Sequence, residues 1–110
     1  MAHKARKRFG QNFLVDQQVI NQIVSTIAPK RMDSIIEIGP GKGALTFPLI
    51  DLLENIHVIE IDRDLIALLQ KKNNIKITIH ESDALVFNFD QFKQKVRIVG
   101  NLPYLSLIHI

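Results

Sequence analysis

Residues 34–43 of the chain read Ser-Ile-Ile-Glu-Ile-Gly-Pro-Gly-Lys-Gly, and this stretch decides the fold. Its first half, residues 34–38, is the β-branched apolar run of a buried strand, and three glycines follow within five residues. The pattern predicts a sharp turn and then a helix over residues 44–53. A glycine turn before a helix N-terminus lets a ligand come close to the backbone. The spacing alone is a weak signal and is also compatible with a tight turn that binds nothing.

Strands and helices alternate on both sides of this stretch. We predict further strands over residues 56–61, 75–80 and 96–100, helices after an N-cap at Asp16 and over residues 64–72, and a weakly helical connection over residues 90–95. The side chains predicted to face the core from the two helices are Val19, Ile20, Ile23, Ile27, Leu65, Ile66, Leu68 and Leu69. Such alternation predicts an α/β fold with a parallel sheet, right-handed crossovers and both sheet faces covered.

Composition and charge narrow the class of protein. The 110 residues are 46% hydrophobic and include no cysteine, so we expect one soluble cytoplasmic domain without disulfides. The four histidines show no metal-ligand spacing, and we expect no metal, no secretory signal and no membrane segment. The net charge of +3 lies in the first 15 residues, which hold Lys4, Arg6, Lys7 and Arg8 and no acid. This basic arm is either a phosphate-binding segment or a solvated tail.

A polar residue follows each predicted strand, where open α/β sheets bind their ligands. Glu60 can accept hydrogen bonds from both ribose hydroxyls of an adenosine, or can serve as a helix-start acid, a role that Asp62 and Asp64 could also fill. Asp83 can reach an adenine amino group, or can form an Asx turn. Glu60 does not separate NAD from S-adenosylmethionine as the ligand, and Asp83 helps more.

The string Asn101-Leu102-Pro103-Tyr104 after the last strand separates NAD from S-adenosylmethionine better. An exocyclic amine on a nucleobase is a poor nucleophile, so its N–H groups must be held by acceptors. The side chain of Asn101 and the backbone carbonyl of Leu102 can accept, Pro103 removes a donor, and Tyr104 can stack on an extruded base. The other interpretation is a proline turn with a buried tyrosine. The string favours methylation of an amino group on a base.

Five segments together resemble the ribosomal RNA adenine dimethyltransferases, namely residues 7–14, 37–46, 58–62, 83–84 and 100–104. The resemblance covers nearly the whole chain and is closer to the small-subunit enzymes than to the large-subunit Erm enzymes, which stay open as an alternative. It implies a Rossmann-like methyltransferase fold and dimethylation of N6 on two adjacent adenosines in small-subunit ribosomal RNA, with S-adenosylmethionine as donor.

The resemblance also implies roles for single residues. Those that would line the cofactor site are Asn12, Leu14, Gly39, Gly41, Glu60, Asp83 and Asn101. Residues 101–104 would meet the target adenine, and the basic arm would bind RNA in the small subunit or its precursor. We expect a monomer.

Family members are longer than this chain. We therefore expect residues 1–15 to be an arm, residues 16–104 a truncated methyltransferase domain without its C-terminal helical domain, and residues 105–110 an atypical tail. Two further classes stay open: an NAD-dependent oxidoreductase, and a non-catalytic RNA-binding or transcription factor on the same fold.

Overall fold

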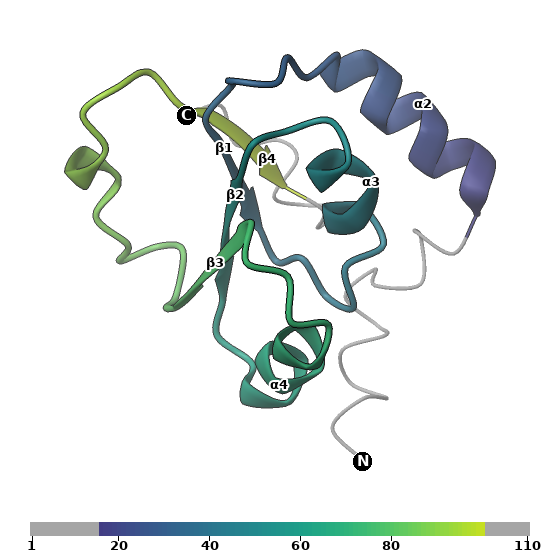
Figure 1. Ribbon diagram of the computed structural model, residues 1–110. Helices are drawn as coiled ribbons and strands as arrows, with labels where there is room; N and C mark the ends of the chain where they lie inside the picture. Colours follow the sequence, from purple (N-terminus) through teal and green to yellow (C-terminus); the bar gives the residue numbers. More distant parts are fainter. Residues whose placement is uncertain (1–15, 101–110) are drawn as a thin grey trace.

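The computed structural model describes residues 16–100, which form one parallel sheet with helices (Figure 1). The elements in chain order are α2 (Gln17–Ile27), β1 (Ile35–Ile38), α3 (Thr46–Ile50), β2 (Ile56–Glu60), α4 (Arg63–Lys71), β3 (Ile77–Glu81), a 3₁₀ turn η2 (Phe89–Gln91) and β4 (Arg97–Gly100). The four strands are ordered β3-β2-β1-β4, and every neighbouring pair is parallel. The predicted α/β class and the predicted alternation are confirmed.

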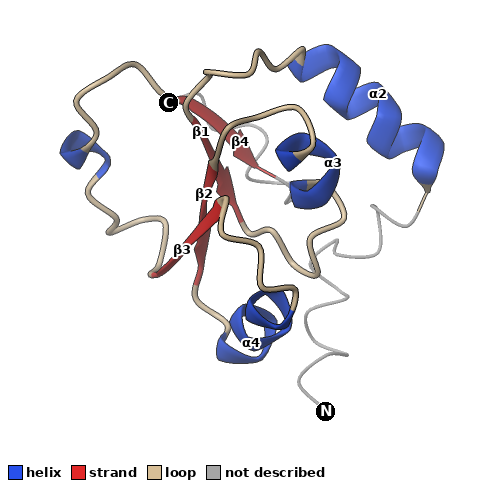
Figure 2. Cartoon of the chain, viewed as in Figure 1, coloured by secondary structure: helices blue, strands red, loops and turns tan. Residues whose placement is uncertain are grey.

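The three helices pack on one face of the sheet, as Figure 2 shows for α2 and α3. Their apolar side chains meet those of the strands in a single core, which contains Ile20, Ile35, Leu45, Leu49, Ile50, Leu53, Ile56, Val58 and Leu69. The other face carries no long helix in the described part of the chain. It is covered by the connection from β3 to β4, whose Phe92 ring packs edge-on against His57 of β2 at 4.9 Å.

Local sequence explains where α2 begins and ends. Asp16 accepts a hydrogen bond from the Gln18 amide at 2.8 Å, so it is the predicted N-cap, and Ala28 ends the helix in a left-handed conformation. The prediction that Val19 faces the core is wrong, because its side chain is 37% exposed. The partly buried Val24 packs against the core instead, since it lies about one turn after the buried Ile20.

Two other elements, α3 and β3, differ from their predicted bounds by two residues or more. Helix α3 begins at Thr46 and not at residue 44, because the glycine turn occupies the preceding residues, and it ends at Ile50 where Leu52 bonds to the Leu49 carbonyl in a tighter turn. Strand β3 begins at Ile77, and Ile75 is 96% exposed.

Candidate cofactor site

The glycine turn after β1 forms the floor of the site, and its glycines serve different purposes. Gly39, Gly41 and Gly43 all have positive φ, at 68°, 59° and 92°, which explains the residue type at each position. A Cβ on Gly43 would lie 2.3 Å from the Phe47 ring, so this glycine lets α3 pack closely. A Cβ on Gly41 would meet no atom of the described residues within 4 Å, although Gly41 is buried. Open space beside a buried backbone is what a bound ligand requires.

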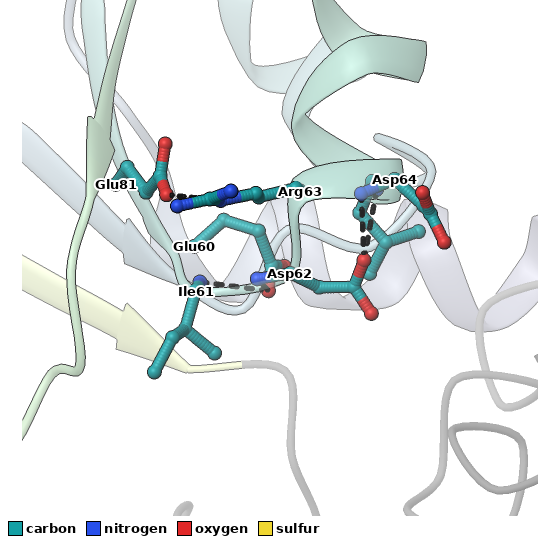
Figure 3. A network of polar contacts seen from close by, with 7 residues as sticks. Glu60, Ile61, Asp62, Arg63, Asp64 and Glu81 are labelled. Atoms are coloured by element: carbon teal, nitrogen blue, oxygen red, sulfur yellow. Dashed lines mark hydrogen bonds and ion pairs between the residues drawn. The ribbon is translucent and has the colours of Figure 1, made fainter. Parts of the chain in front are cut away.

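Glu60 ends β2 next to this turn, and one of its carboxylate oxygens has no partner in the described part of the chain. Its Oε2 accepts from the amides of Ile61 and Asp62 at 3.0 and 3.1 Å, as Figure 3 shows. Its Oε1 is buried and has no hydrogen-bond partner among the described residues. Burial raises the pKa of the Glu60 carboxyl, while the backbone amides of Asp62, Ile61 and Gly41 oppose this rise. The free oxygen can accept a donor from a ligand.

Asp62 caps the start of helix α4, a role that the sequence left open for Glu60 as well. Its carboxylate accepts from the amides of Asp64 and Leu65 at 2.8 and 3.2 Å and so caps α4 (Figure 3). Glu60 therefore does not cap the helix. Beyond it, Arg63 pairs with Glu81 at 3.1 Å, and because both side chains are largely exposed, we expect this ion pair to add little stability.

Glu37, in the middle of β1, was missed by the sequence interpretation. It is 0% exposed, its Oε1 accepts from the Thr46 hydroxyl at 2.5 Å, and its Oε2 has no partner among the described residues. Burial raises its pKa to about 7, with a further contribution from the neighbouring Glu60 charge. One signal could have found it, because Glu37 is the single charged residue inside an isoleucine-rich strand.

Asp83 lies just after β3, at the same edge of the sheet. The chain is held there by a bond from the Ser82 amide to the Glu60 carbonyl at 3.1 Å. Asp83 Oδ1 accepts from the Leu85 amide at 2.9 Å, which is the Asx turn that stood as the alternative to a ligand contact. Two exposed apolar side chains, Ile61 and Leu85, lie at this edge and were not predicted as site residues.

The remaining predicted site residues lie outside the described part of the chain. They are Asn12, Leu14, Asn101, Leu102, Pro103 and Tyr104, together with Lys4, Arg6, Lys7 and Arg8 of the arm. One described residue bears on them: Gly100, the last residue of β4, is paired with Ile38 of β1. The structure thus brings together Gly39, Gly41 and Glu60, with Asp83 at the same edge.

Residues 16–100 hold neither a cluster of metal ligands nor a helix suited to span a membrane. No three His, Cys, Asp or Glu side chains there come together as metal ligands would. Among the helices described, none combines the length and the apolar character needed to cross a membrane.

Comparison with known proteins gives consistent matches. The family model of ribosomal RNA adenine dimethylase matches residues 2–107. Ribosomal RNA small subunit methyltransferase A of Dechloromonas aromatica is 56% identical over 103 residues, which are 93% of this chain and 40% of that protein. The enzyme of the same name from Tolumonas auensis is 53% identical over 109 residues, with 94% and 41% covered.

Solved structures agree with the sequence matches. A dimethyladenosine transferase from Plasmodium falciparum superposes with a TM-score of 0.69 at 26% identity, over 83% of this chain and 34% of that one. The 23S rRNA methyltransferase ErmE superposes with a TM-score of 0.66 at 31% identity, over 77% and 35%. The chain spans about 40% of the length of the curated relatives. With a family model matched over nearly all of its length, this chain belongs to the ribosomal RNA adenine dimethylase family.

Proposed function

We propose that this chain is the cofactor-binding part of an enzyme that transfers methyl groups from S-adenosylmethionine to N6 of two adjacent adenosines in small-subunit ribosomal RNA. The observation that carries the proposal is the buried Oε1 of Glu60, which has no partner among the described residues and lies beside the open space at Gly41. A ribose diol supplies the donors that such an oxygen lacks. The cofactor, when bound, supplies the activated methyl group.

The chain's own residues would divide the work of binding and orientation. Gly39 and Gly41 would let the backbone approach the ligand, and Glu60 would hold its ribose. Ile61 and Asp83, at the edge of the site, would supply an apolar surface and a hydrogen-bond acceptor for the adenine.

Asn101 would orient the target amine. The Asn101 side chain and the Leu102 carbonyl would hold its two N–H groups so that the nitrogen lone pair faces the methyl group in line. Pro103 would keep that carbonyl free, and Tyr104 would stack on the extruded adenine. The amine loses its proton after transfer, so the site would need no strong general base.

We propose ribosomal RNA of the small subunit as the partner, on the basis of the charge of the basic arm and of the relatives of this chain. The basic arm, with Lys4, Arg6, Lys7 and Arg8, would bind phosphates of the ribosomal RNA. Small-subunit enzymes are more than 50% identical to this chain, whereas the large-subunit enzyme ErmE is 31% identical. This difference favours the small subunit over the large one, and family membership favours a methyltransferase over an NAD-dependent oxidoreductase. We place the protein in the cytoplasm as a monomer.

The test uses the full-length protein that contains this chain. It is incubated with radiolabelled S-adenosylmethionine and immature small ribosomal subunits, and the label is mapped on the RNA. We expect label on two adjacent adenosines of the small-subunit RNA. Label on large-subunit RNA would move the assignment to the Erm enzymes, and RNA binding without label would favour a non-catalytic factor. The Asn101→Ala variant should lose transfer and keep cofactor binding, and normal turnover would refute the amine-orienting role.

A further inference from the structure

Glu37 is the least expected residue of the sheet, because it is a carboxyl group with no access to water. It is 0% exposed, it alternates along β1 with Ile36 and Ile38, and among the described residues only its Oε1 has a hydrogen-bond partner, the Thr46 hydroxyl. A buried polar atom without a partner costs about 1–3 kcal/mol, and more when it carries charge. Neither the fold nor the proposed transfer step accounts for this cost.

Glu60 repeats the same feature on the adjacent strand. Its Oε1 is the other buried side-chain oxygen without a partner in the described residues, and the charge of Glu60 acts on Glu37. Two carboxyl groups on adjacent strands, Glu37 inside β1 and Glu60 at the end of β2, therefore each have one buried oxygen without a partner among the described residues. The pair has an excess of acceptors and of negative charge.

The groups packed around Glu37 supply no positive charge that would balance its ionised carboxyl group. Thr46 of α3 and Glu60 of β2 are the groups that act on its carboxyl, and β4 places the apolar Val99 in register with it. The side chains that α2 and α4 contribute to the core, such as Ile20 and Leu69, are apolar. Among residues 16–100, no ion pair involves Glu37 or Glu60. A cation from outside the described residues would balance the negative charge of this pair.

We propose that Glu37 and Glu60 make this end of the sheet selective for a cationic cofactor, and that Glu37 releases its proton to solvent when the cofactor binds. The inference rests on the proposed function, in which the ligand is S-adenosylmethionine with its sulfonium and ammonium charges. A nearby positive charge favours the ionised form of a carboxyl group. Because burial raises the pKa of Glu37 to about 7, roughly half of the carboxyl is protonated at neutral pH and can respond.

The same charge distinguishes the cofactor from its product. S-adenosylhomocysteine keeps the nucleoside, the ammonium and the carboxylate but lacks the positive charge on sulfur. The two carboxyl groups should therefore bind the methyl donor more tightly than the spent product. Glu37 acts here as a positioning and selecting residue, because it touches no reacting atom in the proposed step.

The experiment is titration calorimetry of the full-length protein at pH 7 in phosphate, HEPES and Tris, whose ionisation enthalpies differ. The slope of the binding enthalpy against the buffer enthalpy counts the protons released. We expect about 0.5 proton for S-adenosylmethionine and fewer for S-adenosylhomocysteine. Glu37→Gln should abolish the difference in proton release between the two ligands. It should also lower the ratio of the affinity for S-adenosylmethionine to that for S-adenosylhomocysteine about tenfold.

Two further variants keep the test decisive. Thr46→Val removes the hydrogen bond that lowers the pKa of Glu37, so it should increase the proton release at pH 7. Asp90→Asn changes an exposed carboxylate on the β3–β4 connection and should leave the release unchanged. Circular dichroism checks that each variant is folded. If Glu37→Gln does not fold, the comparison of proton release between the wild type and Thr46→Val still tests the role of Glu37.

Each outcome has a defined meaning. Donor binding without proton release, or release that Thr46→Val does not alter, overturns the role of Glu37 and leaves the proposed function standing. Equal release in folded Glu37→Gln and in wild type assigns the proton to another group and also overturns it. Absence of S-adenosylmethionine binding overturns both proposals together.

Discussion

Replacing Glu37 by glutamine should stabilise the folded protein at alkaline pH relative to the wild type. The carboxyl is fully buried, and burial raises its pKa from the ordinary 4.5 to about 7. A folded state that disfavours the ionised form is stabilised while the group stays protonated. Glutamine keeps the shape and the acceptor for the Thr46 hydroxyl, and it does not ionise.

The magnitude follows from the two pKa values. Below pH 4.5 the wild type holds the proton in both the folded and the unfolded state, so this contribution to stability is complete. As pH rises toward about 7, the unfolded chain gives up the proton first, and the free energy of unfolding falls. Between pH 5 and 8 the loss amounts to roughly 2.5 kcal/mol, at about 1.4 kcal/mol per pKa unit.

Urea unfolding of the full-length protein without ligand measures this difference. The unfolding free energy of Glu37→Gln minus that of the wild type should increase by roughly 2.5 kcal/mol from pH 5 to pH 8. Asp90→Asn serves as the control, because its exposed carboxylate should give a nearly constant difference. A difference for Glu37→Gln that stays flat, or that decreases with pH, would show that Glu37 is ionised and stabilised by a cation, and would refute the reasoning.

Two pairs of variants separate packing from ligand binding. Gly43→Ala should destabilise the protein by about 1–3 kcal/mol, because its Cβ would overlap the Phe47 ring. Gly41→Ala should cost less stability and should weaken the cofactor affinity more. Thermal unfolding measures the loss of stability, and calorimetry measures the affinity. Asp62→Ala should lose an N-cap worth about 1 kcal/mol, seen as a lower Tm, while Glu60→Gln should lower the affinity for S-adenosylmethionine with little change in Tm. Equal effects within either pair would contradict the assignment.

The parts of the fold that the sequence predicts are those that repeat a periodic pattern. Strand β1 and helix α2 are long apolar patterns bounded by clear signals, the glycine turn and the Asp16 cap, and both were predicted to within one residue. Strand β3 was placed two residues early, because Ile75 has the composition of a strand residue. Asn73, with φ of 50°, and the bond from the Ile77 amide to Asn74 delay the strand, and such turn geometry leaves a weaker trace in the sequence.

The candidate site shows a different limit. Glu60 could be singled out because its position after a strand is a rule of the fold. Its competition with Asp62 for the helix cap could not be decided, since both are acids next to a helix start. The structure separates them through Asp62, which bonds to the Asp64 and Leu65 amides. Residue type thus predicts a set of candidates, and hydrogen bonds divide the roles among them.

Glu37 shows why a residue of the candidate site can escape a pattern-based search. An acid within a strand is typical of a solvent-facing side, yet the parallel sheet buries both faces at this position. Valine would fit such a strand and remove the orphaned oxygen, so the carboxyl group lowers the stability of the empty protein. A residue that lowers stability at the edge of a ligand site is best explained by what it does once the ligand is bound. That reasoning joins the pH dependence of folding to the proton release on binding, because one titration at Glu37 must account for both.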